Sequence, residues 1–90
     1  MLLVSYDISN DKKRTQFSRF LQKFGHRIQY SVFEIENSTS ILNNIVTEIE
    51  TKFLKKFDQS DSIYLFQMSS SCIIHKFGYA ENEDDTLIVI

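Results

Sequence analysis

The sequence predicts a small α+β domain in which two helices pack against a β-sheet. Three observations support this class: the first residues alternate between apolar and polar side chains, two segments have apolar side chains at helical spacing, and short apolar segments lie between and after them. The chain has 90 residues, the length of one domain. Such a chain buries only about 60% of its unfolded surface, so association with a second copy would stabilise it.

The first strand and the first helix are expected within residues 2–24. Alternation in residues 2–8 gives two faces, with Leu2, Val4, Tyr6 and Ile8 on one and Leu3, Ser5 and Asp7 on the other. A helix follows the candidate N-caps Ser9, Asn10 and Asp11. Its apolar stripe is Phe17, Phe20, Leu21 and Phe24. Gly25 is expected to be the C′ residue that ends this helix.

The rest of the chain predicts a strand, a second helix and further strands. Residues 26–37 alternate, with one face made of Ile28, Tyr30 and Val32 and the other of Arg27, Gln29, Ser31, Phe33 and Ile35. The second helix runs from about residues 38–40 to Phe57, capped by a Ser or Thr. Residues 62–68 form the next strand, and residues 72–77 form either a short strand or a turn. An acidic loop at residues 81–85 leads into an apolar strand at residues 86–90.

In chain order these elements are β-α-β-α-β, followed by one or two short strands. They match the ferredoxin-like order βαββαβ if residues 26–37 supply two strands, although the periodicity does not show the break. The predicted architecture is a two-layer sandwich, with residues 1–78 as the domain and residues 79–90 as an acidic linker and extra C-terminal strand that contacts a partner. The uncovered sheet face is expected to carry Leu3, Ser5, Asp7, Ser31, Phe33 and Ile35. Because this face is too apolar for water, we predict a homodimer through the sheet faces.

Cysteine content and hydropathy indicate in which cellular compartment the protein is expected. The chain has one cysteine, Cys72, so no internal disulfide can form. The first residues lack the basic and apolar regions of a signal peptide, and no apolar segment approaches the roughly 18 residues of a membrane span. The cytoplasm is the expected compartment, with no membrane association.

Charge is unevenly distributed along the chain, whose formal net charge is −2. Residues 1–35 carry six bases against three acids, whereas residues 36–90 carry four bases against nine acids. A local basic stripe is typical of phosphate binding, although a solvated helix face has the same composition. The candidate nucleic-acid contacts are Lys12, Lys13, Arg14, Arg19 and Arg27.

Asp7 is the main candidate for chemistry. It ends the first strand on the face away from the helices, so its two copies in a sheet-to-sheet dimer would lie near the two-fold axis. Paired carboxylates suit a hard divalent cation, which can activate water against a phosphodiester. An Asp before a helix also commonly caps the following turn, and this alternative stays open. The chain has no CxxC, HExxH, P-loop or GxGxxG pattern.

Ser31 and Phe33 are expected to share the face of Asp7. Ser31 can position a phosphate or a metal-bound water, or serve as a small polar residue at an interface. Phe33 can stack on a base or belong to the core of a dimer.

Two segments together resemble the CRISPR-associated Cas2 family. The first is residues 6–8 (YDI), which precede a helix with a basic segment at residues 12–14 (KKR). The second is residues 25–34 (GHRIQYSVFE), whose pattern G-x-R-x-Q-x-S-V-F is specific at this distance from YDI. The resemblance covers the whole chain in length and approximate element order.

The resemblance implies a ferredoxin-like protomer, a symmetric dimer and a break within residues 26–37. Asp7 would be the catalytic and metal-binding residue, with Mg²⁺ as cofactor, and its surroundings would be Tyr6, Arg14, Arg27, Ser31 and Phe33. In CRISPR spacer acquisition the family bridges dimers of the Cas1 integrase and binds duplex DNA, and it includes metal-dependent nucleases on RNA or DNA. The C-terminal strand would contact the integrase or the other protomer.

Three function classes therefore remain open. The first is a DNA-binding adaptor in spacer acquisition, and the second is a metal-dependent endonuclease, including a stand-alone endoribonuclease of toxin-like type. The third is a ligand-binding ferredoxin-like domain, which the pattern from Asp7 to Phe33 disfavours. The acidic segment after residue 77, and Gln16 where related sequences often have a base, weaken the expected binding of DNA.

Overall fold

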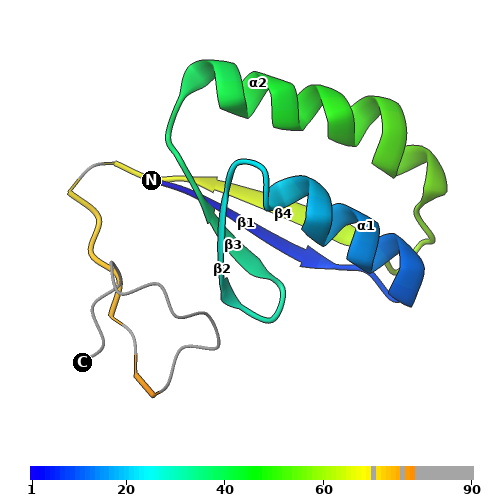
Figure 1. Cartoon of the computed structure of the whole chain (residues 1–90), viewed down its shortest axis with the longest axis horizontal. Coiled ribbons are helices and arrows are strands. Elements are labelled where there is room, and N and C mark those ends of the chain that lie inside the picture. Colours follow the sequence, from blue (N-terminus) through cyan, green and yellow to red (C-terminus); the bar gives the residue numbers. More distant parts are fainter. Residues whose placement is uncertain (70, 76, 79–90) are drawn as a thin grey trace.

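The computed structural model describes residues 1–69, 71–75 and 77–78, and this part of the chain folds as two α-helices and four strands (Figure 1). In chain order these are β1 (Leu2–Asp7), α1 (Asp11–Leu21), β2 (Gly25–Gln29), β3 (Val32–Ile35), α2 (Thr39–Glu48) and β4 (Ser62–Gln67). A π-helical turn, Ile49–Phe53, and a 3-10 turn, Leu54–Lys56, continue α2. None of the helices in the described residues is long and apolar enough to cross a membrane.

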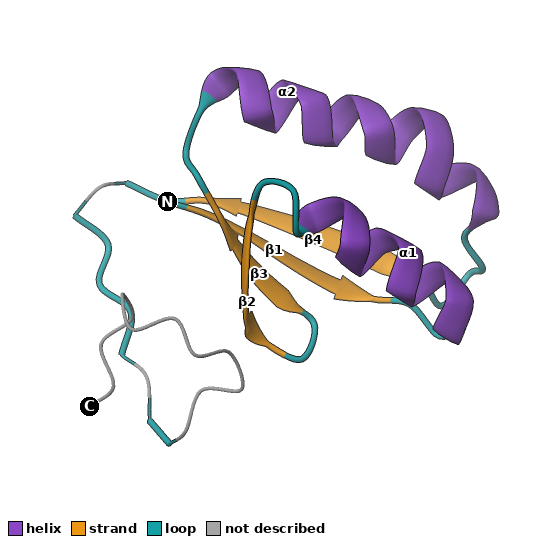
Figure 2. Cartoon of the chain, in the orientation of Figure 1, coloured by secondary structure: helices purple, strands orange, loops and turns teal. Residues whose placement is uncertain are grey.

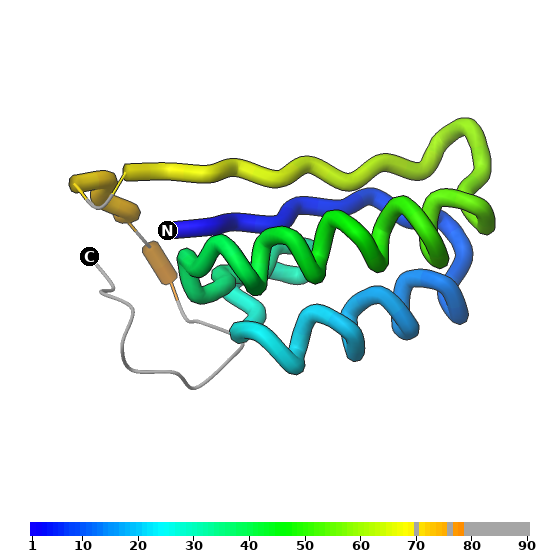
Figure 3. Tube along the Cα trace, turned by 90° about the horizontal axis from the view of Figure 1, so that it is seen from above, coloured from blue at the N-terminus to red at the C-terminus, as the bar shows by residue number. Residues whose placement is uncertain are grey.

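The four strands form one antiparallel sheet in the order β2-β3-β1-β4. Both helices pack on the same face of this sheet (Figure 2), and they lie side by side along it (Figure 3). The predicted break within residues 26–37 is a hairpin with Tyr30 and Ser31 in its turn. The α+β class and the ferredoxin-like order βαββαβ are therefore confirmed.

The alternation predicted for β1 is present in the structure. Leu2, Val4 and Tyr6 are buried beneath the helices, whereas Asp7 is exposed on the opposite face. The buried side chains meet an apolar layer from the helices and from β3, which includes Phe17, Phe20, Leu21, Phe33, Ile45 and Ile49. The core therefore lies between the helices and one sheet face, and the end of β1 sends consecutive side chains to opposite faces.

Both helices begin at predicted capping residues. The Asn10 side chain accepts a hydrogen bond from the Lys13 backbone N–H at 2.9 Å, and the Ser38 hydroxyl accepts one from the Ile41 N–H at 3.5 Å. These bonds satisfy backbone donors that the first helical turn leaves without a partner. The second helical segment ends at Lys56, next to the predicted end at Phe57.

Gly25 does not end α1, as the sequence predicted, but begins β2. Its φ is not positive, so it does not serve as a left-handed cap. A Cβ added at Gly25 would lie 2.0 Å from the backbone oxygen of Glu34 on β3. Glycine is needed here because the two strands approach too closely for any side chain.

The predicted composition of the uncovered sheet face is wrong for Phe33 and Ile35. The register pairs Val4 with Phe33 and Leu2 with Ile35, so both side chains point toward the helices and are buried. Directly paired residues on neighbouring strands share a face. Alternation divides a strand into two sets, but only the register with β1 determines which set is inside.

The C-terminal part of the prediction is only partly covered by the structure. Residues 71–75 contain no strand, and the Cys72 N–H donates to the Ser69 carbonyl at 3.1 Å, which favours the predicted turn over the short strand. The predicted acidic linker and C-terminal strand, residues 79–90, lie outside the described residues.

Candidate functional site

Asp7 lies where β1 ends, paired in register with Ser62 of β4. Burial alternates along β1, so the exposed side chain of Asp7 lies on the sheet face opposite the buried Tyr6, which the helices leave uncovered. No cluster of three or more His, Cys, Asp or Glu side chains occurs among the residues that the structure describes. The described part of one protomer therefore brings a single carboxylate to this point, and a metal ion here needs further ligands.

The same face has an apolar surface beside Asp7, which we call the uncovered patch: Leu3, Val32, Tyr64 and Phe66. Tyr64 and Phe66 are 61% and 45% exposed, and their rings stack with centroids 6.1 Å apart. The register places Tyr64 opposite Ser5 and Phe66 opposite Leu3. Sequence reasoning missed these two rings, although their spacing of two within residues 62–68 places them on one face of a strand.

The five predicted nucleic-acid contacts do not form one uniform stripe. Lys12 and Arg19 are exposed on α1 and free to meet a charged partner. The Lys13 ammonium donates a hydrogen bond to the carbonyl of Lys56, which joins α1 to the end of the second helical segment. Arg14 and Arg27 are partly buried and line the same cavity, so these two cations are brought together.

Arg14 is fixed at the start of α1 by contacts with backbone, carboxylate and ring. Its guanidinium donates to the Ile8 carbonyl at 3.0 Å and to the Asp11 carboxylate, and it lies 5.8 Å from the centroid of the Tyr30 ring. The hydrogen bond that Arg14 donates to the Asp11 carboxylate raises the pKa of Arg14, so the cation is retained at every physiological pH.

The side chain of Arg27 extends from β2 to α1. Its guanidinium donates to the Ser18 hydroxyl at 2.6 Å and lies 5.5 Å from the centroid of the Phe33 ring. Arg14 and Ser18 are four residues apart, so they occupy one face of α1. This spacing could have predicted from the sequence that Ser18 lies beside Arg14. Sequence reasoning missed Ser18, and it also missed Thr15 and Tyr30.

The expectation that Phe33 shares the face of Asp7 is wrong, whereas Tyr6 lies on the opposite face, as the alternation of residues 2–8 predicted. Tyr6 is only 3% exposed, and its ring packs edge-on against Phe17 at 5.1 Å, on the helix side of the sheet. Phe33 is buried on that same side, so neither aromatic ring shares the face of Asp7. Ser31 lies in the turn before β3, and its carbonyl accepts a hydrogen bond from the Tyr6 N–H at 3.0 Å. Ser31 thus supports the backbone beside Asp7.

Residues 1–75 match the sequence model of the family described as CRISPR associated protein Cas2. The chain belongs to the Cas2 family. The match spans all of the described strands and helices of this Cas2 chain, so it covers both Asp7 and the cavity that Arg14 and Arg27 line.

Named relatives support the assignment to the Cas2 family. The chain is 35% identical over 71 residues to a Synechocystis protein named CRISPR-associated endoribonuclease Cas2 3, covering 77% of this chain and 72% of the relative. It is 37% identical over 73 residues to CRISPR-associated endoribonuclease Cas2 1 of Archaeoglobus fulgidus, covering 78% and 72%.

Solved structures share the Cas2 fold. The crystal structure of Streptococcus pyogenes Cas2 at pH 6.5 has a TM-score of 0.62 and 22% identity, covering 78% of this chain and 87% of that one. A hypothetical protein from Thermus thermophilus has a TM-score of 0.65 and 23% identity, covering 81% and 85%.

The donor set at Asp7 of this Cas2 chain fits the implied Mg²⁺. A carboxylate is a hard oxygen ligand, and Mg²⁺ usually keeps several waters while it binds one or two protein carboxylates. The exposed position of Asp7 leaves room for these waters and for a phosphodiester. Asp7 is the residue of the described chain that would hold the ion, with further ligands from outside this protomer.

Proposed function

We propose that this chain is the dimeric Cas2 subunit of a CRISPR spacer-acquisition complex. In this role it binds duplex protospacer DNA and bridges dimers of the Cas1 integrase. It also retains a metal-dependent endonuclease site at the paired Asp7 residues. The observation that carries the proposal is the position of Asp7 beside the uncovered patch in a chain of the Cas2 family.

A second copy of the chain is the proposed cover for the uncovered patch. Tyr64 and Phe66 are large, exposed rings that pair in register with Ser5 and Leu3 on the sheet face that the helices leave open. Contiguous exposed apolar surface usually marks an interface. An isologous contact across this face would place the same residues of each protomer around one two-fold axis, and Asp7 lies at the edge of that face.

The paired carboxylates would then supply what a single protomer lacks. When Mg²⁺ is bound, it polarises a phosphodiester oxygen and lowers the pKa of a bound water. Two copies of Asp7 would hold the ion and fix its position against the backbone of the nucleic acid. Without a cation, the same two carboxylates would repel each other across the two-fold axis.

The exposed bases of α1 support binding to the phosphate backbone of a nucleic acid. Lys12 and Arg19 extend into solvent, where contacts with phosphates carry little sequence information. Such binding releases counterions, so the affinity should fall with added salt. A bridging subunit that must accept many different DNA sequences requires this kind of contact.

The decisive experiment mixes the chain with the Cas1 integrase of the same organism and a short DNA duplex. Size-exclusion chromatography with light scattering measures the composition of the complex. We expect one stable complex with two copies of this chain, formed equally by the wild type and by Asp7→Asn. The matched control is Asp58→Asn, which removes an exposed carboxylate from the loop before β4.

Cleavage assays with Mg²⁺ on the same proteins test the metal site. The wild type and Asp58→Asn should cleave, and Asp7→Asn should lose the metal-dependent activity because it removes the ligand charge. Cleavage that is unchanged in Asp7→Asn would exclude Asp7 from the chemistry. A dimer that ignores Cas1 and DNA would contradict the adaptor role.

A stand-alone metal-dependent endoribonuclease of toxin-like type is the second candidate. The observation that favours it is the name endoribonuclease, which the relatives from Synechocystis and Archaeoglobus fulgidus carry. It predicts Mg²⁺-dependent cleavage of RNA by the isolated dimer, together with no stable complex with the integrase.

A further inference from the structure

The loop that follows Asp7, which we call the β1–α1 loop, is held by hydrogen bonds at each of its residues. β1 ends at Asp7 and α1 begins at Asp11, so the loop consists of Ile8, Ser9 and Asn10. Loops are usually more mobile than the elements that they connect. This loop is fixed instead by two parts of the chain, the first turn of α1 and the loop before β4.

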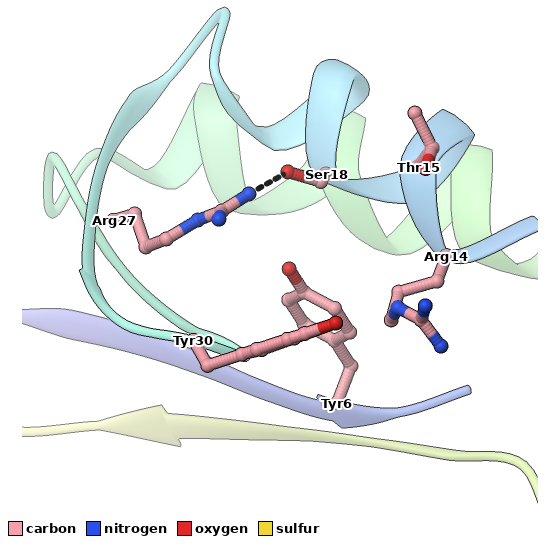
Figure 4. A pocket seen from close by; sticks show the side chains of 6 residues that line it. All are labelled: Tyr6, Arg14, Thr15, Ser18, Arg27 and Tyr30. Carbon is pink, nitrogen blue, oxygen red and sulfur yellow. Dashed lines mark hydrogen bonds between the residues drawn. The ribbon is translucent and has the colours of Figure 1, made fainter. Parts of the chain in front are cut away.

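The start of α1 holds the two ends of the β1–α1 loop. The Arg14 guanidinium donates to the Ile8 carbonyl at 3.0 Å, and the Arg14 side chain extends from α1 toward the end of β1 (Figure 4). The Asn10 carbonyl accepts a hydrogen bond from the Arg14 N–H at 2.9 Å, and the Asn10 side chain accepts one from the Lys13 N–H. These partners are close in sequence, so their bonds do not tie the loop to the rest of the sheet.

Asp61 holds the middle of the β1–α1 loop from a distant part of the chain. Its Oδ1 atom accepts hydrogen bonds from the Ser9 N–H at 3.1 Å and from the Ser9 hydroxyl at 3.2 Å, across 52 residues of sequence. Its Oδ2 atom accepts one from the Asp58 N–H at 3.0 Å, and the Asp61 N–H donates to the Asp58 carbonyl at 3.0 Å. One carboxylate oxygen thus binds the β1–α1 loop, while the other stabilises the turn that carries Asp61.

The position of Asp61 in the chain connects these bonds to Asp7. Asp61 immediately precedes β4, whose first residue, Ser62, is paired with Asp7. The pairing of β1 with β4 ends at this pair, and the bonds between Ser9 and Asp61 continue the connection beyond it. Asp7 therefore lies between the β1–β4 ladder on one side and the Ser9–Asp61 bonds on the other.

The Asp7 carboxylate depends on its own backbone for its position. The side chain is exposed, and no side chain among the described residues forms a hydrogen bond with it. A metal ligand binds best when its position is already fixed before the ion arrives. Because an ordered ligand loses less conformational entropy on binding, the order of the backbone from Asp7 to Ser9 should affect the affinity for the ion.

We propose that Asp61 is a positioning residue for the metal-binding carboxylate of Asp7. It acts through Ser9 and touches neither the metal nor the nucleic acid. The proposal rests on the proposed function, because it concerns the same metal site, and it adds to that site a residue from the loop before β4. Loss of the Asp61 carboxylate should loosen the segment from Asp7 to Ser9 and weaken the binding of a divalent cation.

Binding of Mn²⁺, a probe for Mg²⁺, tests the proposal in the full chain. Electron paramagnetic resonance measures free and bound Mn²⁺ at neutral pH and at a temperature at which every variant is folded. Asp7→Asn identifies the binding that depends on Asp7. Asp61→Ala should weaken this binding about tenfold, the lower end of the usual effect of losing a group that orients a metal ligand. Asp7-dependent binding of equal affinity in the wild type and in Asp61→Ala would overturn the proposal.

Two matched variants separate the effect of position from the effect of charge. Asp61→Asn has no charge but keeps a carbonyl oxygen that can accept the bonds from Ser9. It should therefore restore most of the affinity that Asp61→Ala loses. Asp58→Asn removes a neighbouring carboxylate that accepts none of these bonds, so it should bind Mn²⁺ like the wild type. Equal losses in Asp61→Asn and Asp61→Ala would mean that charge is the cause and would overturn the positioning role.

Ser9→Ala decides the question if Asp61→Ala does not fold. It removes the hydroxyl bond to Asp61 and keeps the bond from the Ser9 N–H. It should weaken Mn²⁺ binding in the same direction as Asp61→Ala but by a smaller factor. Wild-type affinity in both Ser9→Ala and Asp61→Asn would then count against the proposal.

Amide hydrogen exchange in the metal-free protein separates this proposal from the proposed function. Asp61→Ala should speed exchange at Asp7 and Ile8 about tenfold, because local opening of the segment becomes easier. Val4, fully buried within β1, is the internal reference and should not change. A wild type without Asp7-dependent Mn²⁺ binding would contradict the metal site of the proposed function. Faster exchange in Asp61→Ala would still support the positioning of Asp7, and unchanged exchange would overturn it.

Discussion

The two faces of the sheet differ most at the end of β1, where consecutive residues supply them. On the helix side, the Tyr6 ring lies in the core and its hydroxyl enters a cavity lined by two arginines. On the other side, Asp7 is exposed at the edge of an apolar surface with stacked rings. One face is thus covered by the helices and has two arginines at its edge, whereas the other has a carboxylate at its edge and leaves apolar rings exposed.

This difference shows that one dipeptide can serve two separate surfaces. The pleat of the strand keeps the Tyr6 hydroxyl and the Asp7 carboxylate apart although their backbones are adjacent. Changes on one face should therefore leave the other face intact. The following predictions test that independence, from the largest expected effect to the smallest.

Phe33→Ala should destabilise the protein far more than Phe66→Ala. Phe33 is fully buried between β3 and the helices, so its truncation should cost about 3–5 kcal/mol of unfolding free energy. Phe66 is 45% exposed on the uncovered face and loses fewer contacts within the protomer. Urea denaturation at equal protein concentrations measures both. Equal losses would contradict the difference between a completed and an open face.

Phe66→Glu should break self-association without unfolding the protomer. A charge placed in the uncovered patch would be desolvated in a dimer, and we expect dissociation to become easier by about 2 kcal/mol, roughly thirtyfold in the dimer Kd. Sedimentation equilibrium at several concentrations measures it. Leu54→Glu is the control, since Leu54 is an exposed apolar residue of the helical layer. A dimer that resists Phe66→Glu would move the interface away from this face.

The smallest effect is expected where two loops meet, one between β1 and α1 and the other before β4. The Asp61 carboxylate accepts hydrogen bonds from the Ser9 N–H, the Ser9 hydroxyl and the Asp58 N–H. The backbone hydrogen bonds from Asp58 and then Ser9 lower the pKa of Asp61 from 3.8. A lowered carboxyl pKa means that stabilisation is present above pH 3.8 and is lost as the pH falls through the folded-state value.

An acid titration followed by circular dichroism tests this role of Asp61. Asp61→Asn should remove part of the loss of stability below about pH 4, because its side chain does not titrate. Asp58→Asn, whose side chain accepts none of these bonds, should keep the wild-type acid profile. An identical profile for Asp61→Asn would mean that these bonds do not stabilise the fold.

Local patterns in the sequence were enough to predict the elements of the fold. Alternation gave β1 and its two faces, and side-chain spacing with capping residues gave the start of both helices, although α1 ends at Leu21 and not at Phe24 as predicted. Asn10 and Ser38 each accept a hydrogen bond from the backbone N–H three residues later, so no distant contact is needed to identify them as caps. The prediction succeeded wherever the determining interaction lies within one turn or one strand.

Non-local contacts explain the parts that the sequence did not reveal. The side of Phe33 depends on its register with Val4, which is far away in the chain. Only a glycine fits at position 25 because the Glu34 carbonyl is close, and Glu34 belongs to the neighbouring strand β3. At the candidate site, Asp7 was placed correctly on the uncovered face, but the cavity was missed because Tyr6, Arg14 and Arg27 come from three elements.

The alternation of β1 also limits how the gene can change. Substitution at Tyr6 or Asp7 alters one face at a time, and selection can act on each separately. Insertion or deletion of one residue earlier in the strand would exchange the two faces, turning the carboxylate toward the core and the phenol toward solvent. Evolution can therefore vary this segment residue by residue, but it cannot readily change its length.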